Sequence, residues 1–205
     1  MIEVKNLSFS YNKKPIINNI SFEIRDDEIV GLVAPSGYGK STLGKIISGY
    51  IRDYAGDIIV DGKNISDISG FFPVQMVHQS PEKNVDNRWK IRKILNEGWK
   101  VDKKTKEELG IEEFWLDKFP VELSGGELQR VLIARILSPN TKYIVADEIS
   151  TMLDSITQLK IMKVLKDINK KRNIGILLIS HNKSLVEKMS DRIIDLEYIN
   201  NKSRD

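Results

Sequence analysis

The stretch IVGLVAPSGYGKST, residues 29–42, is the part of this chain that decides the fold. Residues 29–33 are apolar apart from one glycine and predict a strand buried on both faces. Residues 41–49 predict a helix that ends at a glycine. Between them, Gly37 and Gly39 permit a tight loop whose N–H groups point inward, as in a phosphate-binding loop. The alternative, a glycine-rich connection with a chance lysine, does not explain why a strand and a helix flank it.

Two polar residues give this loop a chemistry. We expect Lys40 to reach the β and γ phosphates of a nucleotide and Ser41 to hold Mg²⁺. Ala34 stands where the pattern usually has its first glycine, and Tyr38 is bulkier than the usual small residue. If the backbone at Ala34 needs a positive φ, the alanine would cost about 1 kcal/mol.

The composition limits the classes of protein to consider. The chain has 205 residues, no cysteine and a net charge of +3, which excludes disulfides and thiolate metal sites and does not favour a nucleic-acid binder. The first residues do not form a signal peptide. The longest clear apolar run, residues 174–179, is far shorter than the ~20 residues of a membrane span. We therefore expect a soluble globular protein, with any membrane part supplied by other chains.

The rest of the chain alternates between predicted strands and helices. Apolar patterns predict strands within residues 1–33 and at residues 74–78, 143–146, 174–179 and 192–196, a hairpin at residues 56–65, and helices at residues 155–172 and 183–189. The long helix is expected to place Ile156, Leu159, Met162 and Leu165 on one side. This alternation predicts a largely parallel sheet.

Residues 82–122 are charged, favour helix and hold all three tryptophans. We interpret them as part of an inserted helical lobe, residues 82–134. The core with its β lobe is then formed by residues 1–81 and 135–205, within one domain of residues 1–205.

Two consecutive carboxylates close the predicted strand at residues 142–146. Asp147 would lie beside the phosphate loop, where a carboxylate can serve Mg²⁺. Glu148 could then polarise an attacking water as a general base. An ordinary polar strand end is the alternative for both residues.

Other polar residues follow predicted strands. Gln79 could ligate Mg²⁺ or position water, and His181 could contact a γ-phosphate, although isolated residues of these types usually have surface or structural roles. His78 is interpreted as packing without a functional role. Tyr11 could stack on adenine or be a half-buried strand aromatic.

Residues 123–127, Leu-Ser-Gly-Gly-Glu, predict the start of another helix. Ser124 and Glu127 have the spacing of a capping box. Gly125 and Gly126 would let another molecule approach the helix start, where an anion is favoured. Asp154, with Leu153, could form a contact between subunits or cap the helix that follows it.

In chain order, these motifs resemble the nucleotide-binding subunit of an ABC transporter over about residues 1–197. Residues 123–127, placed between the phosphate loop and Asp147, are the most specific part of the resemblance. It implies an α/β fold with a RecA-like P-loop NTPase core, an antiparallel β lobe and an inserted α-helical lobe. In place of the family's usual Pro-Thr-Ser-Ala, residues 149–152 are Ile-Ser-Thr-Met.

The resemblance also assigns roles, with ATP and Mg²⁺ as cofactors. It implies catalytic roles for Glu148, His181 and Gln79, and Mg²⁺ ligands at Ser41, Gln79 and Asp147. The nucleotide contacts that it implies are Tyr11, Ser36, Gly37, Tyr38, Gly39, Lys40, Ser41, Thr42, Ser124, Gly125, Gly126, Glu127 and Asp154.

A narrower likeness lies in residues 75–81, 85–88 and 94–95, which look like the ATPases of oligopeptide and nickel importers, although Ser80 and residues 86–87 depart from their pattern. It implies an ATP-hydrolysing subunit that powers import of a small solute, a peptide or nickel complex, through a separate permease. The C-terminal extension that many such members carry is expected to be absent.

The expected partners are a second identical or homologous ATPase in a head-to-tail dimer, membrane permease subunits and an extracytoplasmic substrate-binding protein, with no nucleic acid. The expected location is peripheral, at the cytoplasmic face of the cell membrane. Two alternatives stay open. One is a non-transport ABC ATPase of DNA repair or translation, although such proteins usually carry insertions, zinc cysteines or tandem cassettes. The other is a catalytically weak regulatory subunit, which the departures at Ala34 and Ile149 leave open.

Overall fold

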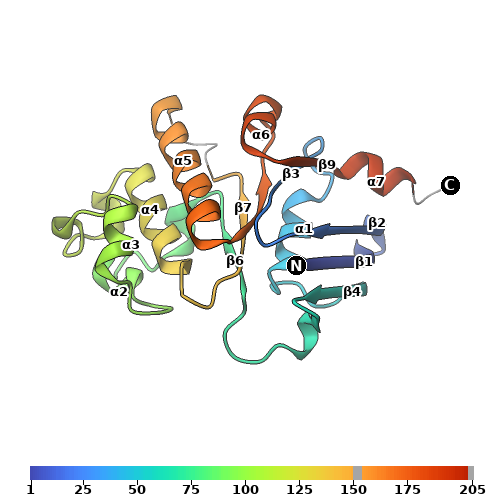
Figure 1. Cartoon of the computed structure of the whole chain (residues 1–205), viewed down its shortest axis with the longest axis horizontal. Helices are drawn as coiled ribbons and strands as arrows, with labels where there is room; N and C mark the ends of the chain where they lie inside the picture. Colours follow the sequence, from blue (N-terminus) through green and yellow to red (C-terminus); the bar gives the residue numbers. More distant parts are fainter. Residues whose placement is uncertain (150–153, 203–205) are drawn as a thin grey trace.

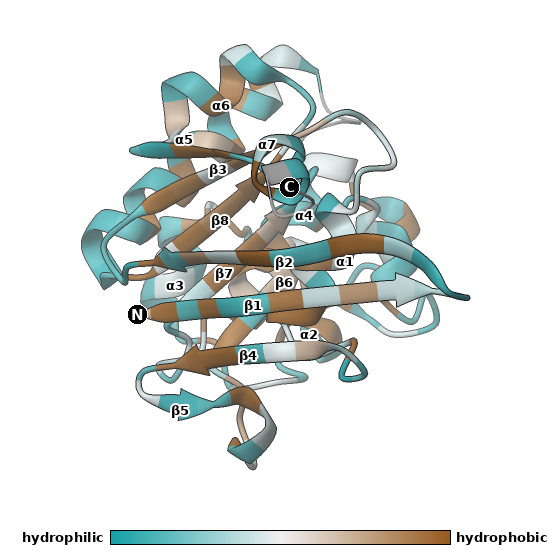
Figure 2. Cartoon of the chain, turned by 90° about the vertical axis from the view of Figure 1, so that its right-hand side faces the viewer, coloured by the Kyte–Doolittle hydropathy of each residue, from teal (hydrophilic) through white to brown (hydrophobic). Residues whose placement is uncertain are grey.

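A computed structural model of the chain describes residues 1–149 and 154–202, whose strands form two sheets (Figures 1 and 2). The first is antiparallel, in the order β2-β1-β4-β5, and consists of β1 (Ile2–Tyr11), β2 (Lys14–Ile24), β4 (Ala55–Val60) and β5 (Lys63–Asn64). The second is parallel, in the order β6-β7-β8-β3-β9, and consists of β3 (Ile29–Val33), β6 (Val74–Val77), β7 (Tyr143–Asp147), β8 (Gly175–Ile179) and β9 (Arg192–Asp195). The predicted parallel sheet and antiparallel lobe are confirmed.

The helices fall into groups according to the part of the fold to which they belong. Those associated with the parallel sheet are α1 (Lys40–Ile47), α5 (Ser155–Arg172) and α6 (Lys183–Met189), whereas α7 (Leu196–Lys202) contacts β2 of the antiparallel sheet as well as β3 and β9. The segment predicted as a helical lobe contains α2 (Ile91–Leu95), α3 (Lys103–Glu108) and most of α4 (Gly125–Ile136). Short 3-10 helices are η1 (Ile65–Asp67), η2 (Pro81–Asn84), η3 (Glu113–Trp115) and η4 (Pro120–Glu122). Within the described ranges, no helix combines the length and apolarity needed to cross a membrane.

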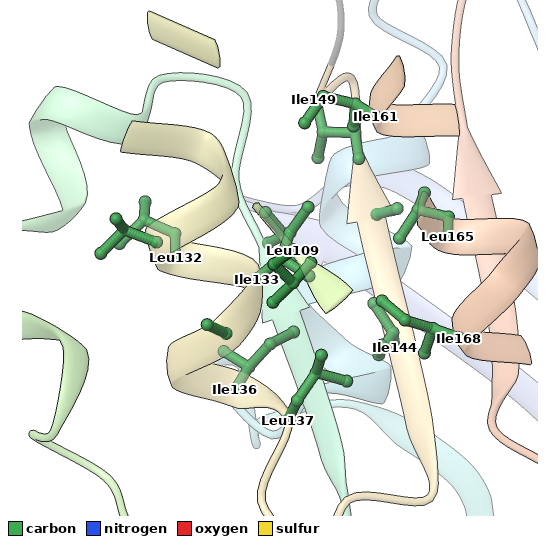
Figure 3. Close-up of a cluster of buried hydrophobic side chains, with 14 of the residues drawn as sticks. Leu109, Leu132, Ile133, Ile136, Leu137, Ile144, Ile149, Ile161, Leu165 and Ile168 are labelled. Carbon is green, nitrogen blue, oxygen red and sulfur yellow. The ribbon is translucent and has the colours of Figure 1, made fainter. Parts of the chain in front are cut away.

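The strands β3, β7 and β8 are buried along their whole length, and neighbouring side chains of a strand point to opposite faces of the sheet. In β7, Tyr143 and Val145 pack with α1 and the antiparallel sheet. Ile144 and Ala146 belong instead to a second core that includes side chains of α4 and α5 (Figure 3). In Figure 1, α1 therefore lies on one side of the sheet and α4 on the other. This separation places the phosphate loop and residues 123–127 on opposite faces.

The hairpin and the end of α1 follow the sequence prediction. Asp61 and Gly62 form the turn between β4 and β5, with φ of 50° and 79°. Both angles are positive, as a type I′ hairpin turn requires. Gly49, two residues beyond α1, has φ of 76° and takes the left-handed conformation that ends a helix.

The prediction for the buried side of α5 was partly wrong. Met162 and Leu165 are buried, but Ile156 and Leu159 are 68% and 66% exposed. A run spaced strictly by three residues drifts by about 60° at each step around a helix of 3.6 residues per turn. The core-facing side of α5 is instead formed by Ile161, Met162, Leu165 and Ile168.

The helix α7 was not predicted, since the sequence analysis ended with a strand at residues 192–196. Leu196 is fully buried against the core shared with α1, and Ile199 is partly buried there. The Asp195 carboxylate accepts a hydrogen bond from the Tyr198 N–H at 3.1 Å, which turns the chain into the helix directly after β9.

Candidate nucleotide-binding site

The loop between β3 and α1 has the tight backbone that its glycines predict. Gly37 and Gly39 have φ of 82° and 92°, and Gly39 is the residue that precedes α1. A Cβ atom added to Gly39 would lie 2.6 Å from Cγ2 of Ile16, so the space there is also filled. Ala34 does not have a positive φ, and the strain considered for an alanine at this position does not arise.

The Lys40 side chain folds over this loop. Its ammonium donates hydrogen bonds to the carbonyl oxygens of Ala34, at 2.7 Å, and Pro35, at 3.1 Å. The residue is only 7% exposed. Phosphate oxygens can compete with neutral carbonyls for this donor, because a bond between two charged groups is the stronger one.

A pocket of about 300 Å³ opens beside the loop. Its lining residues are Tyr11, Ile16, Ser36, Gly37, Gly39, Lys40, Ser41, Thr42 and Glu148. One wall is apolar. It is formed by Tyr11 and Ile16, which lie on the neighbouring strands β1 and β2. The opposite wall is the loop and the start of α1, where N–H groups and the helix dipole attract an anion. The pocket therefore suits a ligand with a flat apolar end and an anionic end.

Tyr11 fits both interpretations made from the sequence, as a strand aromatic and as a residue that could stack on adenine. Its ring packs edge-on against Phe9 of the same strand, with ring centroids 4.7 Å apart. The residue is nevertheless 49% exposed and lines the pocket. Ile16, across the hairpin, is a pocket residue that the sequence analysis missed. Its position soon after the hairpin turn that follows Tyr11 was the available signal.

Asp147 and Ser41 meet beneath the pocket. The Ser41 hydroxyl donates to Oδ1 of Asp147 at 3.0 Å, and Asp147 is 6% exposed. Burial raises the pKa of Asp147, and the nearby charge of Glu148 raises it further. A cation at this place would relieve both effects, and hydroxyl and carboxylate oxygens are ligands that Mg²⁺ accepts.

Magnesium commonly binds through one or two protein oxygens together with substrate phosphates. In residues 1–149 and 154–202, no group of three or more histidine, cysteine, aspartate or glutamate side chains could hold a metal ion. The pair Ser41 and Asp147 therefore fits a Mg²⁺ ion that arrives with a nucleotide, rather than one held by the protein alone.

Glu148 turns away from the strand that carries Asp147. Its φ is 49°, a left-handed conformation that is uncommon for a residue with a side chain. Its N–H donates to the carbonyl of Ile179 at 2.9 Å, and its Oε2 lies 3.0 Å from Nδ1 of His181. The ends of β7 and β8 thus bring Asp147, Glu148 and His181 together, and the bend gives the two carboxylates different partners.

Several residues expected to contact the nucleotide lie outside this pocket. Gln79 follows β6, is exposed, and is not among the described residues that line the pocket. Tyr38 is 37% exposed and is likewise absent from that lining. Asp154 accepts hydrogen bonds from the N–H groups of Ile156 and Thr157, both at 3.0 Å, so it caps α5. Leu153 and residues 150–152 lie outside the described residues.

The start of α4 forms the predicted capping box. The Ser124 hydroxyl accepts from the Glu127 N–H at 3.3 Å, and Oε2 of Glu127 accepts from the Ser124 N–H at 2.7 Å. Gly125 is exposed, as expected for a residue that another molecule approaches. Gly126 is buried, and a Cβ added there would lie 2.3 Å from Cγ2 of Thr157 in α5. The second glycine therefore has a packing role within the chain, which corrects the expectation that both glycines were left open.

Known proteins are similar to this chain in sequence and in fold. The family described as ABC transporter matches residues 17–151. The chain is 33% identical to the dipeptide transport ATP-binding protein DppF of Lactococcus lactis and 34% identical to the oligopeptide transport ATP-binding protein OppF of Streptococcus mutans. Each match covers 94% of this chain and 70% of the relative.

A solved structure agrees with these matches. The dimeric structure of MJ0796, a bacterial ABC transporter cassette, is similar with a TM-score of 0.78 at 25% identity, over 95% of this chain and 94% of that one. The sequence match covers more than half of the chain, and the fold match covers nearly all of it. The chain belongs to the ABC transporter family.

Proposed function

We propose that this chain is the ATP-hydrolysing subunit of an importer of peptides. One observation carries the ATPase part: Glu148 lies on the wall of a phosphate-loop pocket whose other end is aromatic. The names of the two relatives, a dipeptide and an oligopeptide transport protein, support a peptide over a nickel complex as the imported solute.

The pocket accounts for the orientation of ATP. The adenosine end would lie against Tyr11 and Ile16, and the phosphates would lie along residues 36–42. Lys40 would exchange its two carbonyl partners for phosphate oxygens. Ser41 and Asp147 would hold Mg²⁺, which supplies charge to stabilise the phosphates as the bond breaks.

Glu148 is the residue best placed to activate water. As water attacks the γ-phosphorus, the carboxylate would accept its proton, and ADP would leave with the electron pair of the broken bond. The contact with His181 restrains one carboxylate oxygen. His181 is therefore a positioning residue for Glu148 as well as a candidate phosphate contact.

A second ATPase subunit completes the site in this proposal. Residues 123–127 start α4, and α4 packs on the opposite face of the sheet from α1 and its phosphate loop. An exposed helix start with an exposed Gly125 is suited to a phosphate, but it does not line this chain's own pocket among the described residues. A head-to-tail dimer, with an identical or homologous partner, would place it over the partner's ATP.

A groove supports contact with a membrane permease. It has a volume of about 340 Å³ and lies between the core and the helical segment, with Tyr50, Phe71, His78 and Arg135 among its lining residues. Tyr50 is 64% exposed and Phe71 is 38% exposed. The chain would then work at the cytoplasmic face of the membrane, and the substrate-binding protein would work at the opposite face.

His78, which was interpreted from the sequence as packing without a functional role, also lines this groove. Its ring packs edge-on against Tyr50, with centroids 5.4 Å apart. Burial lowers its pKa, so the neutral ring is favoured. A neutral aromatic surface of this kind is suited to an apolar side chain of the permease.

The test is purification of the chain from membranes, followed by identification of the co-purifying chains. A permease and a substrate-binding protein, with ATP hydrolysis stimulated by peptide, are expected. Ribosomes or DNA in their place would overturn the transport proposal and favour a non-transport ATPase. In the same complex, Glu148→Gln should retain ATP binding and lose at least about 100-fold in turnover. The exposed Glu187→Gln is the matched control and should retain full turnover.

A further inference from the structure

The Asn200 side chain links the helix α7 to the free edge of the antiparallel sheet. Oδ1 of Asn200 accepts from the backbone N–H of Asn18 at 2.7 Å, and Nδ2 donates to the backbone carbonyl of Ile16 at 3.0 Å. Asn200 is only 4% exposed. Both partners belong to β2, the edge strand of its sheet, and α7 lies beside that strand in Figure 2. The carboxamide therefore takes the place of a peptide group of a further strand.

The part of β2 that Asn200 holds is irregular. Ser10 pairs with Pro15 and Phe9 pairs with Ile17, so Ile16 is an extra residue without an opposite partner on β1. Such a bulge disrupts the ladder locally. Pro15 cannot donate a backbone hydrogen bond, which weakens the pairing further. The two bonds from Asn200 thus fix a segment that β1 alone holds poorly.

The same segment forms a wall of the pocket. Ile16 lines the pocket together with Tyr11. Its side chain also packs where a Cβ of Gly39 would lie, 2.6 Å from Cγ2. A shift of β2 would therefore move the apolar wall with respect to the phosphate loop.

We propose that Asn200 is a positioning residue for nucleotide binding, which holds Ile16 in place against the nucleoside end of ATP. The inference rests on the proposed function, because it assumes that the pocket binds ATP with its nucleoside against Tyr11 and Ile16. The phosphate end is held by a different element, the loop before α1. Loss of Asn200 should consequently weaken binding of the nucleoside and spare binding of the phosphates.

The test compares two ligands by calorimetry with the full chain: ATP, and inorganic tripolyphosphate, which lacks the nucleoside. Asn200→Ala should weaken ATP binding about fivefold, since one buried hydrogen-bond pair is lost. Its affinity for tripolyphosphate should stay within about twofold. Asn201→Ala, at the exposed neighbouring position of α7, is the matched control and should leave both affinities unchanged.

The possible outcomes separate the two proposals. Failure of the unmodified chain to bind ATP would remove the proposed function, and the inference with it. Unchanged ATP affinity in Asn200→Ala, or an equal loss for both ligands, would overturn the positioning role while leaving the ATPase intact. If Asn200→Ala does not fold, Asn200→Asp replaces it, because aspartate keeps the acceptor for Asn18 and loses the donor to Ile16. A selective loss of ATP affinity in that variant supports the proposal, and its absence overturns it.

Discussion

Nδ1 of His181 lies 3.0 Å from Oε2 of Glu148, so a side-chain contact links the ends of two neighbouring parallel strands. The His181 side chain is 60% exposed, whereas that of Glu148 is 19% exposed. The histidine can thus be reached by a ligand from outside while it restrains the more buried carboxylate. This arrangement makes the two residues one unit in the proposed hydrolysis.

Residues that act as one unit should have non-additive effects on turnover. His181→Ala should lower the turnover of the assembled ATPase, by less than Glu148→Gln does. The double variant should be no slower than Glu148→Gln alone, because the histidine acts through the carboxylate that has already been neutralised. Steady-state phosphate release from the four proteins measures this. Losses that multiply would show that His181 contributes independently of Glu148.

The packing of Gly126 against α5 predicts different effects for two neighbouring glycines. Gly126→Ala should lower the free energy of unfolding by about 1–3 kcal/mol, because its Cβ has no room beside Thr157. Gly125→Ala, at the exposed position, should be neutral or slightly stabilising, because alanine favours helix. Urea unfolding of both variants makes the comparison.

A double variant tests the cause of the loss. Thr157→Ala removes the methyl group that the new Cβ would meet, so Gly126→Ala combined with Thr157→Ala should regain part of the lost stability. If Gly126→Ala is as stable as the unmodified chain, the packing role of this glycine is wrong.

The side of α5 that faces the core is also testable. Leu165 is 1% exposed, and Leu165→Ala should cost about 2–5 kcal/mol of unfolding free energy. Leu159 is 66% exposed, and Leu159→Ala should change it by no more than about 0.5 kcal/mol. Thermal unfolding followed by circular dichroism distinguishes the two. Comparable losses at both positions would favour the stripe expected from the sequence.

This helix shows which parts of the fold could be predicted from the sequence. Strands such as residues 29–33 are short, apolar and bounded by turn residues, so their burial follows from local pattern alone. For α5, the apolar spacing predicted that Leu159 and Leu165 lie on the same buried side, and only packing against the rest of the fold buries Leu165 and leaves Leu159 exposed. The helix α7 was missed because its last turn is fixed by Asn200, whose partners on β2 are more than 180 residues earlier.

Some residues of the candidate site could likewise be predicted from the sequence, and others could not. Asp147, Glu148 and His181 each follow a predicted strand and were assigned to one site by the resemblance, and they lie at the ends of the neighbouring strands β7 and β8. Ile16 and the intrachain reason for Gly126 depend on contacts between distant segments. Neither could be derived from the spacing of motifs.

Asp61 joins the hairpin between β4 and β5 to the start of β7. Its carboxylate accepts hydrogen bonds from Lys142 at 2.5 Å and from the Tyr143 hydroxyl at 2.8 Å. Burial alone would raise its pKa, but the bonds from Lys142, the N-terminal amine and Tyr143 outweigh it and lower the pKa to about 2. A lowered pKa stabilises the folded state above the usual aspartate pKa, and that contribution is lost as the pH falls from about 4 to about 2.

Asp61→Asn should therefore lower the free energy of unfolding at pH 7 by about 1–2 kcal/mol, a value reduced by partial solvent exposure. The difference from the unmodified chain should shrink as the pH approaches 2. Asp53→Asn, at an exposed position outside the ion pairs of the described residues, is the control. Urea unfolding between pH 2.5 and 7 measures both. A difference independent of pH would show that ionisation of Asp61 is not the cause.

The phosphate loop and the start of α4 lie on opposite faces of the sheet. Dimers of two copies of this chain can therefore test whether each ATP site is composed of parts from both chains. Lys40→Ala removes the phosphate-loop cation, and Ser124→Arg blocks the start of α4. If each site combines the loop of one chain with the α4 start of the other, placing the two changes on separate chains leaves one site intact. Placing both changes on the same chain, beside an unmodified chain, leaves none.

Hybrids with the changes on separate chains should therefore hydrolyse ATP at about half the normal rate, and hybrids with both on one chain should be nearly inactive. Sites formed within single chains would give the reverse pattern, since the unmodified partner would then retain a complete site. Tagging the two copies differently isolates each hybrid, and phosphate release measured on both decides between the arrangements.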